Sequence, residues 1–210
     1  MVGLGSSKSD LTDTKTKILA VSNQLFAKQG FDGVSIRDIA QEAEVNVASI
    51  NYHFKNKLNL FHEIFEYNYK WMEVEIEAIT SQEDIDTESM AWAVFSMFMQ
   101  NGAAIKNSFE MIISDHLSPS QDDADPKEHF GPPGGEALLK VITKEVGEEI
   151  LLETREWAMR MLFTNIIHSA IFMNTEFIKT KCRQESWMKP EIKEKEVKML
   201  ARALVNHIKS

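Results

Sequence analysis

Apolar side chains recur every three to four residues along most of this chain, which is the spacing of an α-helix. The 210 residues include only 5 prolines and 9 glycines, so long stretches lack the residues that end helices. The pattern predicts an all-α protein with helices over about 12–29, 47–53, 57–79, 87–101, 103–117, 136–146, 148–180 and 190–208, and a short one of about eight residues from Ser35. Four of the five prolines fall between Ser118 and Gly135, where we expect a loop.

The segment after the first helix contains residues that begin and end short helices. Gly30 follows the first helix as a C-terminal glycine does. Ser35 and Asp38 have the spacing of a capping box, in which each side chain binds a free main-chain N–H. Asn46 is a good N-cap for the next short helix. Two short helices joined by a tight turn are predicted here, which is the arrangement of a helix-turn-helix.

The pattern divides the chain into three parts. We expect a disordered arm over 1–10, a three-helix helix-turn-helix domain over 11–56, and a larger helical domain over 57–210. Residues 158–173 are apolar nearly all round, and such a helix must be covered on every side. We therefore predict a homodimer through the helices at about 148–180 and 190–208. In the last helix the stripe predicted to complete an intermolecular four-helix bundle comprises Val197, Leu200, Ala201, Leu204, Val205 and Ile208.

The charge is distributed unevenly along the chain. The net charge is −9, but residues 1–60 hold seven basic and six acidic residues, so the acidity belongs to the C-terminal part. This permits DNA binding by a few well-placed N-terminal residues. The chain has a single cysteine, Cys182, so an intrachain disulfide is excluded. Residues 1–9 lack the apolar core of a signal peptide. Residues 158–173 form the most apolar long stretch, but they are too few for a membrane span. We expect a cytoplasmic protein that does not enter a membrane.

The second short helix has the composition of a helix that reads DNA. A recognition helix needs small or hydrogen-bonding residues on its outer face so that it fits the major groove. The side chains predicted to reach bases or phosphates there and in the flanking residues are Ser35, Arg37, Val47, Ala48, Ser49, Asn51, Tyr52, His53, Lys55 and Lys57. Among them a serine can donate to a base or accept from one, and an asparagine can pair with adenine. The predicted partner is double-stranded DNA.

Residues 13–62 resemble the DNA-binding domain of TetR-family regulators, and the run Tyr52-His-Phe-Lys-Asn-Lys57 carries the resemblance most strongly. The resemblance implies an all-helical fold of about nine helices, a homodimer, a palindromic operator, and release or rearrangement when a ligand enters the C-terminal domain. It also assigns roles to particular residues. Ser35 and Arg37 take DNA-backbone contacts, Tyr52, His53 and Lys57 take phosphate contacts, Phe54 packs, and the recognition helix carries Val47, Ala48, Ser49 and Asn51.

Two positions depart from the family's pattern. Glu44 stands where the turn usually has a glycine, so we expect a strained or adjusted turn and slightly weaker binding to DNA. Leu58 stands where an acidic residue is common, which we interpret as harmless.

The C-terminal part carries aromatic and methionine residues that either fill its core or line a cavity for a small apolar effector. The predicted pocket residues are Trp92, Phe95, Met99, Phe109, His116, Met159, Phe163 and His168. The same spacing is also typical of an ordinary core, and a histidine on an apolar helix is more often buried with a partner than bound to a ligand. The sequence leaves both interpretations open.

No cofactor, metal site or catalytic site is predicted. The acidic and histidine residues of one stretch do not have a zinc or calcium spacing, namely His116, Asp122, Asp123, Asp125 and His129. Nucleophile-elbow, P-loop and dinucleotide motifs are absent. The interpretation we favour is a ligand-responsive transcriptional regulator, most often a repressor. The alternatives are a helical scaffold that has lost its operator and, less favoured, an enzyme that uses a C-terminal cavity.

Overall fold

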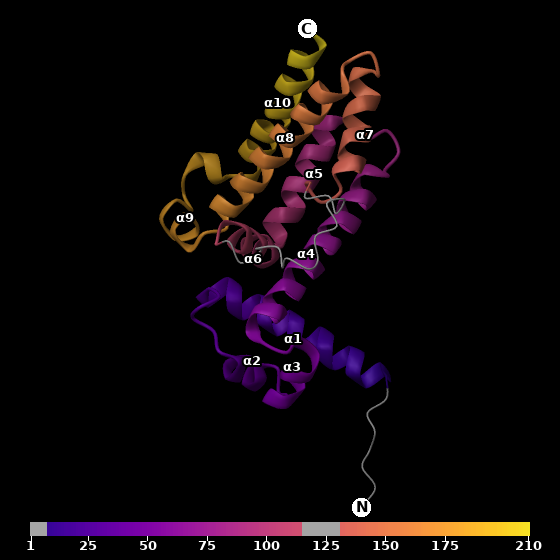
Figure 1. The fold of residues 1–210 in the computed structure, drawn as a ribbon. Coiled ribbons are helices and arrows are strands. Elements are labelled where there is room, and N and C mark those ends of the chain that lie inside the picture. The colour runs from indigo at the N-terminus through magenta and orange to yellow at the C-terminus, as the bar shows by residue number, and fades with distance from the viewer. Residues whose placement is uncertain (1–7, 115–130) are drawn as a thin grey trace, which may run out of the picture. The chain divides into compact units, whose positions relative to one another are not determined.

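The computed structural model describes residues 8–114 and 131–210, with side chains from Thr14 onward. Within these ranges the only regular secondary structure is helical, which confirms the predicted all-α fold (Figure 1). The elements are α1 (Lys8–Gln29), α2 (Ile36–Glu42), α3 (Val47–Phe54), α4 (Lys57–Thr80), α5 (Thr87–Gln100), α6 (Gly102–Ile113), α7 (Gly135–Val146), α8 (Leu152–Met173), α9 (Glu176–Lys181), the 3-10 helix η1 (Ser186–Met188) and α10 (Pro190–Lys209). None of these helices is both long and apolar enough to cross a lipid bilayer.

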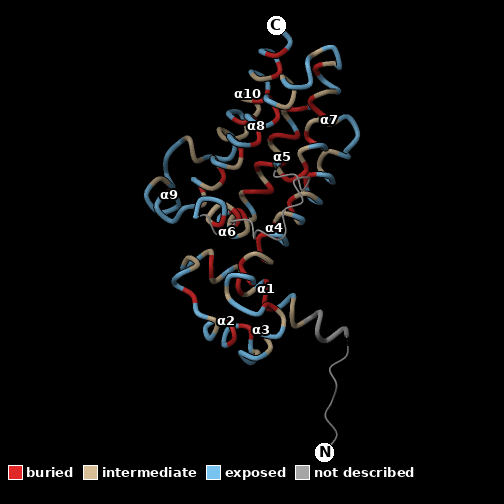
Figure 2. Tube along the Cα trace, viewed as in Figure 1, coloured by how far each residue is buried: buried red, intermediate tan, exposed pale blue. Residues whose placement is uncertain are grey.

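The described residues form two compact units. The first comprises residues 8–69 and 106–114, which are α1, α2, α3, the first half of α4 and most of α6. Its core is closed by aromatic side chains, since the Phe26 and Phe61 rings meet edge to face with centroids 5.0 Å apart. The core residues on α2 and α3 include Ile39, Ile50 and Phe54, each at most 2% exposed. The short helices are therefore fixed by one apolar edge each, and their other sides stay open to solvent (Figure 2).

The second unit comprises residues 70–105 and 131–210. Its core lies among α5, α7, α8 and α10, whose inner faces supply most of the buried residues (Figure 2). Polar contacts between the helices help to fix it: Glu145 on α7 accepts from the main-chain N–H of Thr87 at 2.9 Å, and Arg202 on α10 makes two bonds to Glu88 on α5 at 2.7 and 2.8 Å. The Arg202 guanidinium holds the pKa of the Glu88 carboxyl below its ordinary value.

The division between the units runs through helices. The predicted domain boundary lay before residue 57, whereas the first unit extends into α4 as far as Tyr69 and also contains most of α6. α1 begins at Lys8, inside the predicted arm. Residues 1–7 and most of the predicted loop from 118 lie outside the described residues.

The prediction of one helix over 148–180 was wrong. α8 ends at Met173, Asn174 caps it, and Thr175 starts α9 by accepting from the N–H of Ile178 at 3.4 Å. Residues 148–151 precede α8 and are not helical. No glycine or proline marks the break at Asn174, so apolar spacing alone could not locate it.

The stripe predicted on the last helix packs inside its own subunit. In α10 the stripe residues Val197, Ala201, Val205 and Ile208 are buried, and Leu200 and Leu204 pack partly buried against the same core. The expectation that they face a second copy was wrong for this stripe. A helix at the edge of a monomer core needs one apolar face for that core, and this is the face that the periodicity detected.

Candidate DNA-binding site

α3 presents a solvent-exposed face of small and hydrogen-bonding residues, while two buried side chains anchor the helix. Ile50 is fully buried and Phe54 is 2% exposed. Asn46 starts the helix by accepting from the N–H of Ser49 at 2.6 Å, as predicted for an N-cap. Six of the predicted DNA-binding residues lie on this helix. Four of them are exposed, namely Val47, Ala48, Asn51 and Tyr52. Ser49 and His53 are half-buried.

The predicted capping box of α2 is present. The Ser35 hydroxyl accepts from the N–H of Asp38 at 3.2 Å, and the Asp38 carboxylate accepts from the N–H of Ser35 at 2.8 Å. The Ser35 hydroxyl also donates to that carboxylate at 2.6 Å. These bonds from Ser35 hold the pKa of the Asp38 carboxyl below its ordinary value. Arg37 stands exposed in the first turn of the same helix.

The turn between α2 and α3 contains the strain that the sequence predicted. Glu44 has a φ of 52°, in the left-handed region that favours glycine. Gly30, at the end of α1, has the same sign of φ, 74°, without a side chain. The Glu44 carboxylate forms an exposed ion pair with Lys17 on α1 at 3.4 Å. Its negative charge is therefore partly balanced within the unit, although it stays beside the start of α3.

Lys57 has a structural contact that the sequence did not indicate. Its Nζ donates to the main-chain oxygens of Phe31 at 2.8 Å and Val34 at 3.1 Å, and it lies 4.1 Å from the centroid of the Phe31 ring. Asn56, not Lys57, caps α4, by accepting from the N–H of Asn59 at 2.8 Å. The ammonium group predicted to bind phosphate thus binds the loop between α1 and α2. Lys55, the other predicted lysine, is exposed.

Side chains of α6 bind the second half of α1 and the loop that follows it, and these contacts help to position the loop before the helix-turn-helix. Asn107 is 1% exposed, and its Nδ2 donates to the main-chain oxygen of Asn23 at 2.6 Å. Asn23 in turn pairs with Asn68 of α4, also 1% exposed, at 3.2 Å. Glu110 accepts from the N–H of Phe31 at 3.2 Å. These contacts join residues up to 84 positions apart, so local sequence patterns could not reveal them.

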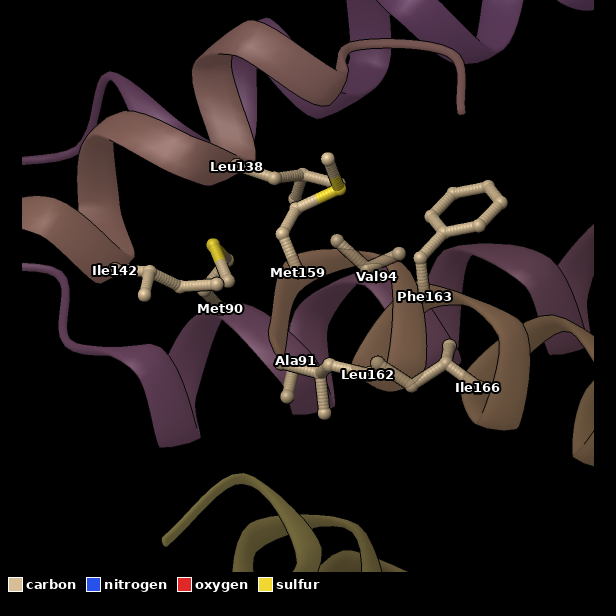
Figure 3. A pocket seen from close by; sticks show the side chains of 9 residues that line it. All are labelled: Met90, Ala91, Val94, Leu138, Ile142, Met159, Leu162, Phe163 and Ile166. Atoms are coloured by element: carbon tan, nitrogen blue, oxygen red, sulfur yellow. The ribbon is translucent and has the colours of Figure 1, made fainter. Parts of the chain in front are cut away.

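The second unit contains an apolar cavity among α5, α7 and α8, lined by Met90, Ala91, Val94, Leu138, Ile142, Met159, Leu162, Phe163 and Ile166 (Figure 3). It measures about 10 Å³, roughly the room that one water molecule needs. Of the predicted pocket residues, Met159 and Phe163 line it.

The other predicted pocket residues do not meet at this cavity. Phe95 is buried in the core of the same unit, against which Trp92 and Met99 pack half-buried, while His168 is exposed on α8. Phe109 belongs to the first unit, and His116 lies outside the described residues. The described residues contain no group of three or more histidine, cysteine or acidic side chains that could hold a metal ion. The other members of the stretch weighed as a metal site, namely Asp122, Asp123, Asp125 and His129, fall in the same undescribed segment.

Residues 18–64 match the family model described as bacterial regulatory proteins, tetR family. The matched segment contains α2, α3 and the turn between them. The chain is also similar to two named regulators over part of its length. The chain is 40% identical to "Probable HTH-type transcriptional regulator YttP" of Bacillus subtilis over 76 residues, which is 36% of each chain. It is 40% identical to the HTH-type transcriptional regulator AcrR of Shigella flexneri over 60 residues, 29% of this chain and 28% of AcrR.

The similarity in fold extends further than the similarity in sequence. The crystal structure of the TetR-family regulator PfmR from Thermus thermophilus matches with a TM-score of 0.63 over 90% of this chain and 97% of PfmR, at 17% identity. At that identity the match establishes a common fold. The sequence matches span about a third of the two relatives' own length.

Proposed function

We propose that this chain, whose residues 18–64 match the family model of bacterial regulatory proteins, tetR family, is a homodimeric, ligand-responsive repressor that binds a palindromic operator. The family consists of transcriptional regulators and not of enzymes. The open face of α3, with Asn51 and Tyr52 exposed above the buried anchors Ile50 and Phe54, is the observation that carries the proposal.

This face suits the major groove for a steric and a chemical reason. The residues that project from the N-terminal half of α3 are short, so the helix backbone can approach base edges closely. Asn51 can pair with the edge of adenine, and the methyl groups of Val47 and Ala48 can contact thymine. Tyr52, which is 73% exposed, extends far enough to reach a phosphate.

Few charges are available to attract the phosphate backbone. Arg37 on α2 and Lys55, which follows α3, are exposed, whereas Lys57 already binds two main-chain oxygens. We therefore assign the phosphate contacts principally to Arg37, Lys55 and Tyr52. With few cationic contacts per subunit, binding depends on two subunits that hold their α3 helices about 34 Å apart, one turn of the duplex.

The outer face of α8 is the surface that we assign to the homodimer. Its inner residues belong to the core, but Trp157 and Met161 are each 40% exposed and Phe172 is 55% exposed. Met199 of α10 is 60% exposed. Four exposed apolar side chains on two long helices favour a protein partner at this surface. The two-fold symmetry of the proposed palindromic operator favours a second copy of the chain as that partner.

The dimer is tested by Met161→Glu, which places a charge on the outer face of α8 without touching the core. Light scattering after size exclusion should show a dimer for the wild type and a monomer for this variant. Val74→Glu is the matched control because Val74 is an exposed apolar residue of α4 in the same unit. A wild-type monomer, or a dimer that survives Met161→Glu unchanged, contradicts the assignment.

The apolar cavity is the site that we propose for a small apolar effector. Its volume is far below the 300–1,000 Å³ or so of common ligand pockets, so an effector must select a state in which the lining has moved apart. Met90 and Met159, which line the cavity (Figure 3), suit this because unbranched thioether side chains repack readily. A compound that releases DNA and raises the melting temperature should lose both effects in Met159→Phe. A response that persists in this variant places the effector elsewhere.

DNA binding is tested by selecting duplexes from a random library with the full chain and measuring affinity against salt. We expect a palindrome with two equivalent half-sites, and an affinity that falls as salt rises. Lys55→Ala should reduce the slope of log K against log salt by about 1 for each phosphate that the lysine neutralises. Lys28→Ala is the control, since Lys28 is exposed at the end of α1, outside the α2–α3 pair. Failure to select any sequence, under all salt conditions, refutes the proposal.

A further inference from the structure

The hydroxyl group of Ser49 is already committed as a donor. Its Oγ lies 3.0 Å from Oδ1 of Asn46, and the same Oδ1 accepts from the N–H of Ser49 at 2.6 Å. An atom that accepts from a main-chain N–H is the amide oxygen, which has no hydrogen to give. The hydrogen between the two oxygens is therefore the one carried by Ser49. Because its hydrogen is used in this bond, the Ser49 hydroxyl can take part in further hydrogen bonds only as an acceptor, through its lone pairs.

From this geometry we propose that Ser49 recognises an amino-bearing base, adenine or cytosine, on one strand of each operator half-site. In the major groove the only hydrogen-bond donors on bases are the N6 amino group of adenine and the N4 amino group of cytosine. Guanine and thymine present acceptors at the corresponding positions, which repel an acceptor. A serine can in general pair with either class, so the bond to Asn46 is what narrows the choice. The inference rests on the proposed DNA-binding function of α3.

The position of Ser49 on α3 supports a direct contact. Ser49 is the third residue of the helix, and the N-terminal residues of a recognition helix are the ones that contact base edges. It is half-buried, so its hydroxyl remains accessible while the neighbouring Ile50 is fixed in the core. Val47 and Ala48 carry no hydrogen-bonding side chain, and Asn51 carries both a donor and an acceptor. The hydrogen-bonding polarity of Ser49 is thus set by the fold.

Asn46 acts as a positioning residue in this scheme. It begins α3 and, through the same oxygen, directs the hydroxyl of Ser49. Asn46→Asp keeps an oxygen that accepts from both Ser49 groups, so the preference for an amino-bearing base should persist, with a uniform loss of affinity from the added charge. Asn46→Gly removes the acceptor at a small cost in helix capping. The freed hydroxyl can then donate, and guanine or thymine should be tolerated at the same position.

The test begins with sequences selected by the full-length protein from random duplexes. One position in each half-site should show adenine or cytosine on one strand, and substitution there by guanine or thymine should weaken binding by about 2- to 12-fold. Ser49→Ala should abolish this preference at that position and no other. Ser49→Thr, which retains the hydroxyl, should preserve it. Melting temperatures of all variants establish that each is folded.

A base-deletion cycle measures the contact itself. At the selected position, adenine is replaced by purine, or cytosine by 2-pyrimidinone, which removes only the amino group. The modified duplex should weaken binding of the wild type about 2- to 12-fold more than it weakens binding of Ser49→Ala. Any effect of the altered base pairing on the duplex itself is the same for both proteins and cancels in this comparison. Equal losses in the two proteins overturn the proposal, as does a preference for guanine or thymine that depends on Ser49. Asn46→Gly with an unchanged preference overturns the role of Asn46. A protein that selects no sequence at all refutes the DNA-binding function and this inference with it.

Discussion

Replacing Glu44 by glycine should make the N-terminal unit more stable, although the change removes an ion pair. At a φ of 52° a side chain other than glycine costs about 1–2 kcal/mol. Glycine makes the unfolded chain more flexible, which lowers the free energy of unfolding by roughly 0.4–1 kcal/mol and offsets part of the relieved strain. The Lys17–Glu44 pair is 3.4 Å long, with side chains 47% and 85% exposed, so its loss costs about 0–0.5 kcal/mol. The balance is a gain of about 0.5 kcal/mol in the free energy of unfolding.

Two further substitutions separate strain from charge. Glu44→Asn keeps a side chain but tolerates the left-handed region, so its stability should fall between those of the wild type and Glu44→Gly. Glu44→Gln keeps the strain and removes only the charge, so it should gain no stability. All three variants lack the negative charge beside α3, and all three should bind operator DNA more tightly at low salt, with the gain shrinking as salt rises.

The assays are urea unfolding, followed by helical circular dichroism, and fluorescence anisotropy with a labelled operator. If the turn is strained, stability falls in the order Glu44→Gly, Glu44→Asn, Glu44→Gln, whereas affinity for the operator does not follow this order. Glu44→Gly that is no more stable than Glu44→Gln would refute the view that the turn is strained. Equal affinity of the wild type and Glu44→Gln at low salt would refute the effect of the charge.

Three other substitutions test contacts in the two units. Lys57→Met should lower the free energy of unfolding by about 2 kcal/mol, because two main-chain oxygens lose a charged donor; a loss of operator binding without a loss of stability would contradict this. Asp38→Ala should cost stability above pH 3.8, and the cost should fade as pH drops through the lowered pKa of the folded carboxyl, where the wild type also loses the charge; a difference that grows in acid would contradict the capping box. Gly134→Ala should lower the free energy of unfolding by about 2–4 kcal/mol, as measured by thermal unfolding, since Gly134 has a φ of 65° and a Cβ there would lie 2.5 Å from the Ile76 side chain. Gly131→Ala is its control, with nothing within 4 Å of the added carbon.

The helix-turn-helix was predictable because its signals are local. Gly30 ends α1 with a positive φ, Ser35 and Asp38 form the expected box, and Asn46 caps α3. Each of these depends on residues at most a few positions apart. The unusual turn residue Glu44 was also visible in the sequence, and its left-handed φ follows from the tight turn that the two helices require.

What the sequence left unresolved depends on partners distant along the chain. Lys57 is a residue type that commonly binds phosphate, but the main-chain oxygens that it binds belong to Phe31 and Val34, 26 and 23 residues earlier. The stripe on α10 indicated an apolar face without indicating whether the same subunit or another one covers it. Aromatic and methionine spacing likewise could not separate a pocket from a core, and the structure gathers only Met159 and Phe163 of that set at the cavity.

The most direct measurement of the central claim compares two exposed tyrosines of the N-terminal unit. Tyr52 on α3 is 73% exposed and Tyr67 on α4 is 53% exposed, so neither substitution by alanine disturbs the core. With a selected operator and anisotropy titrations at fixed salt, Tyr52→Ala should weaken binding about tenfold, and Tyr67→Ala should bind as the wild type does. If the two variants bind alike, or if only Tyr67→Ala is impaired, α3 is not the surface that meets DNA.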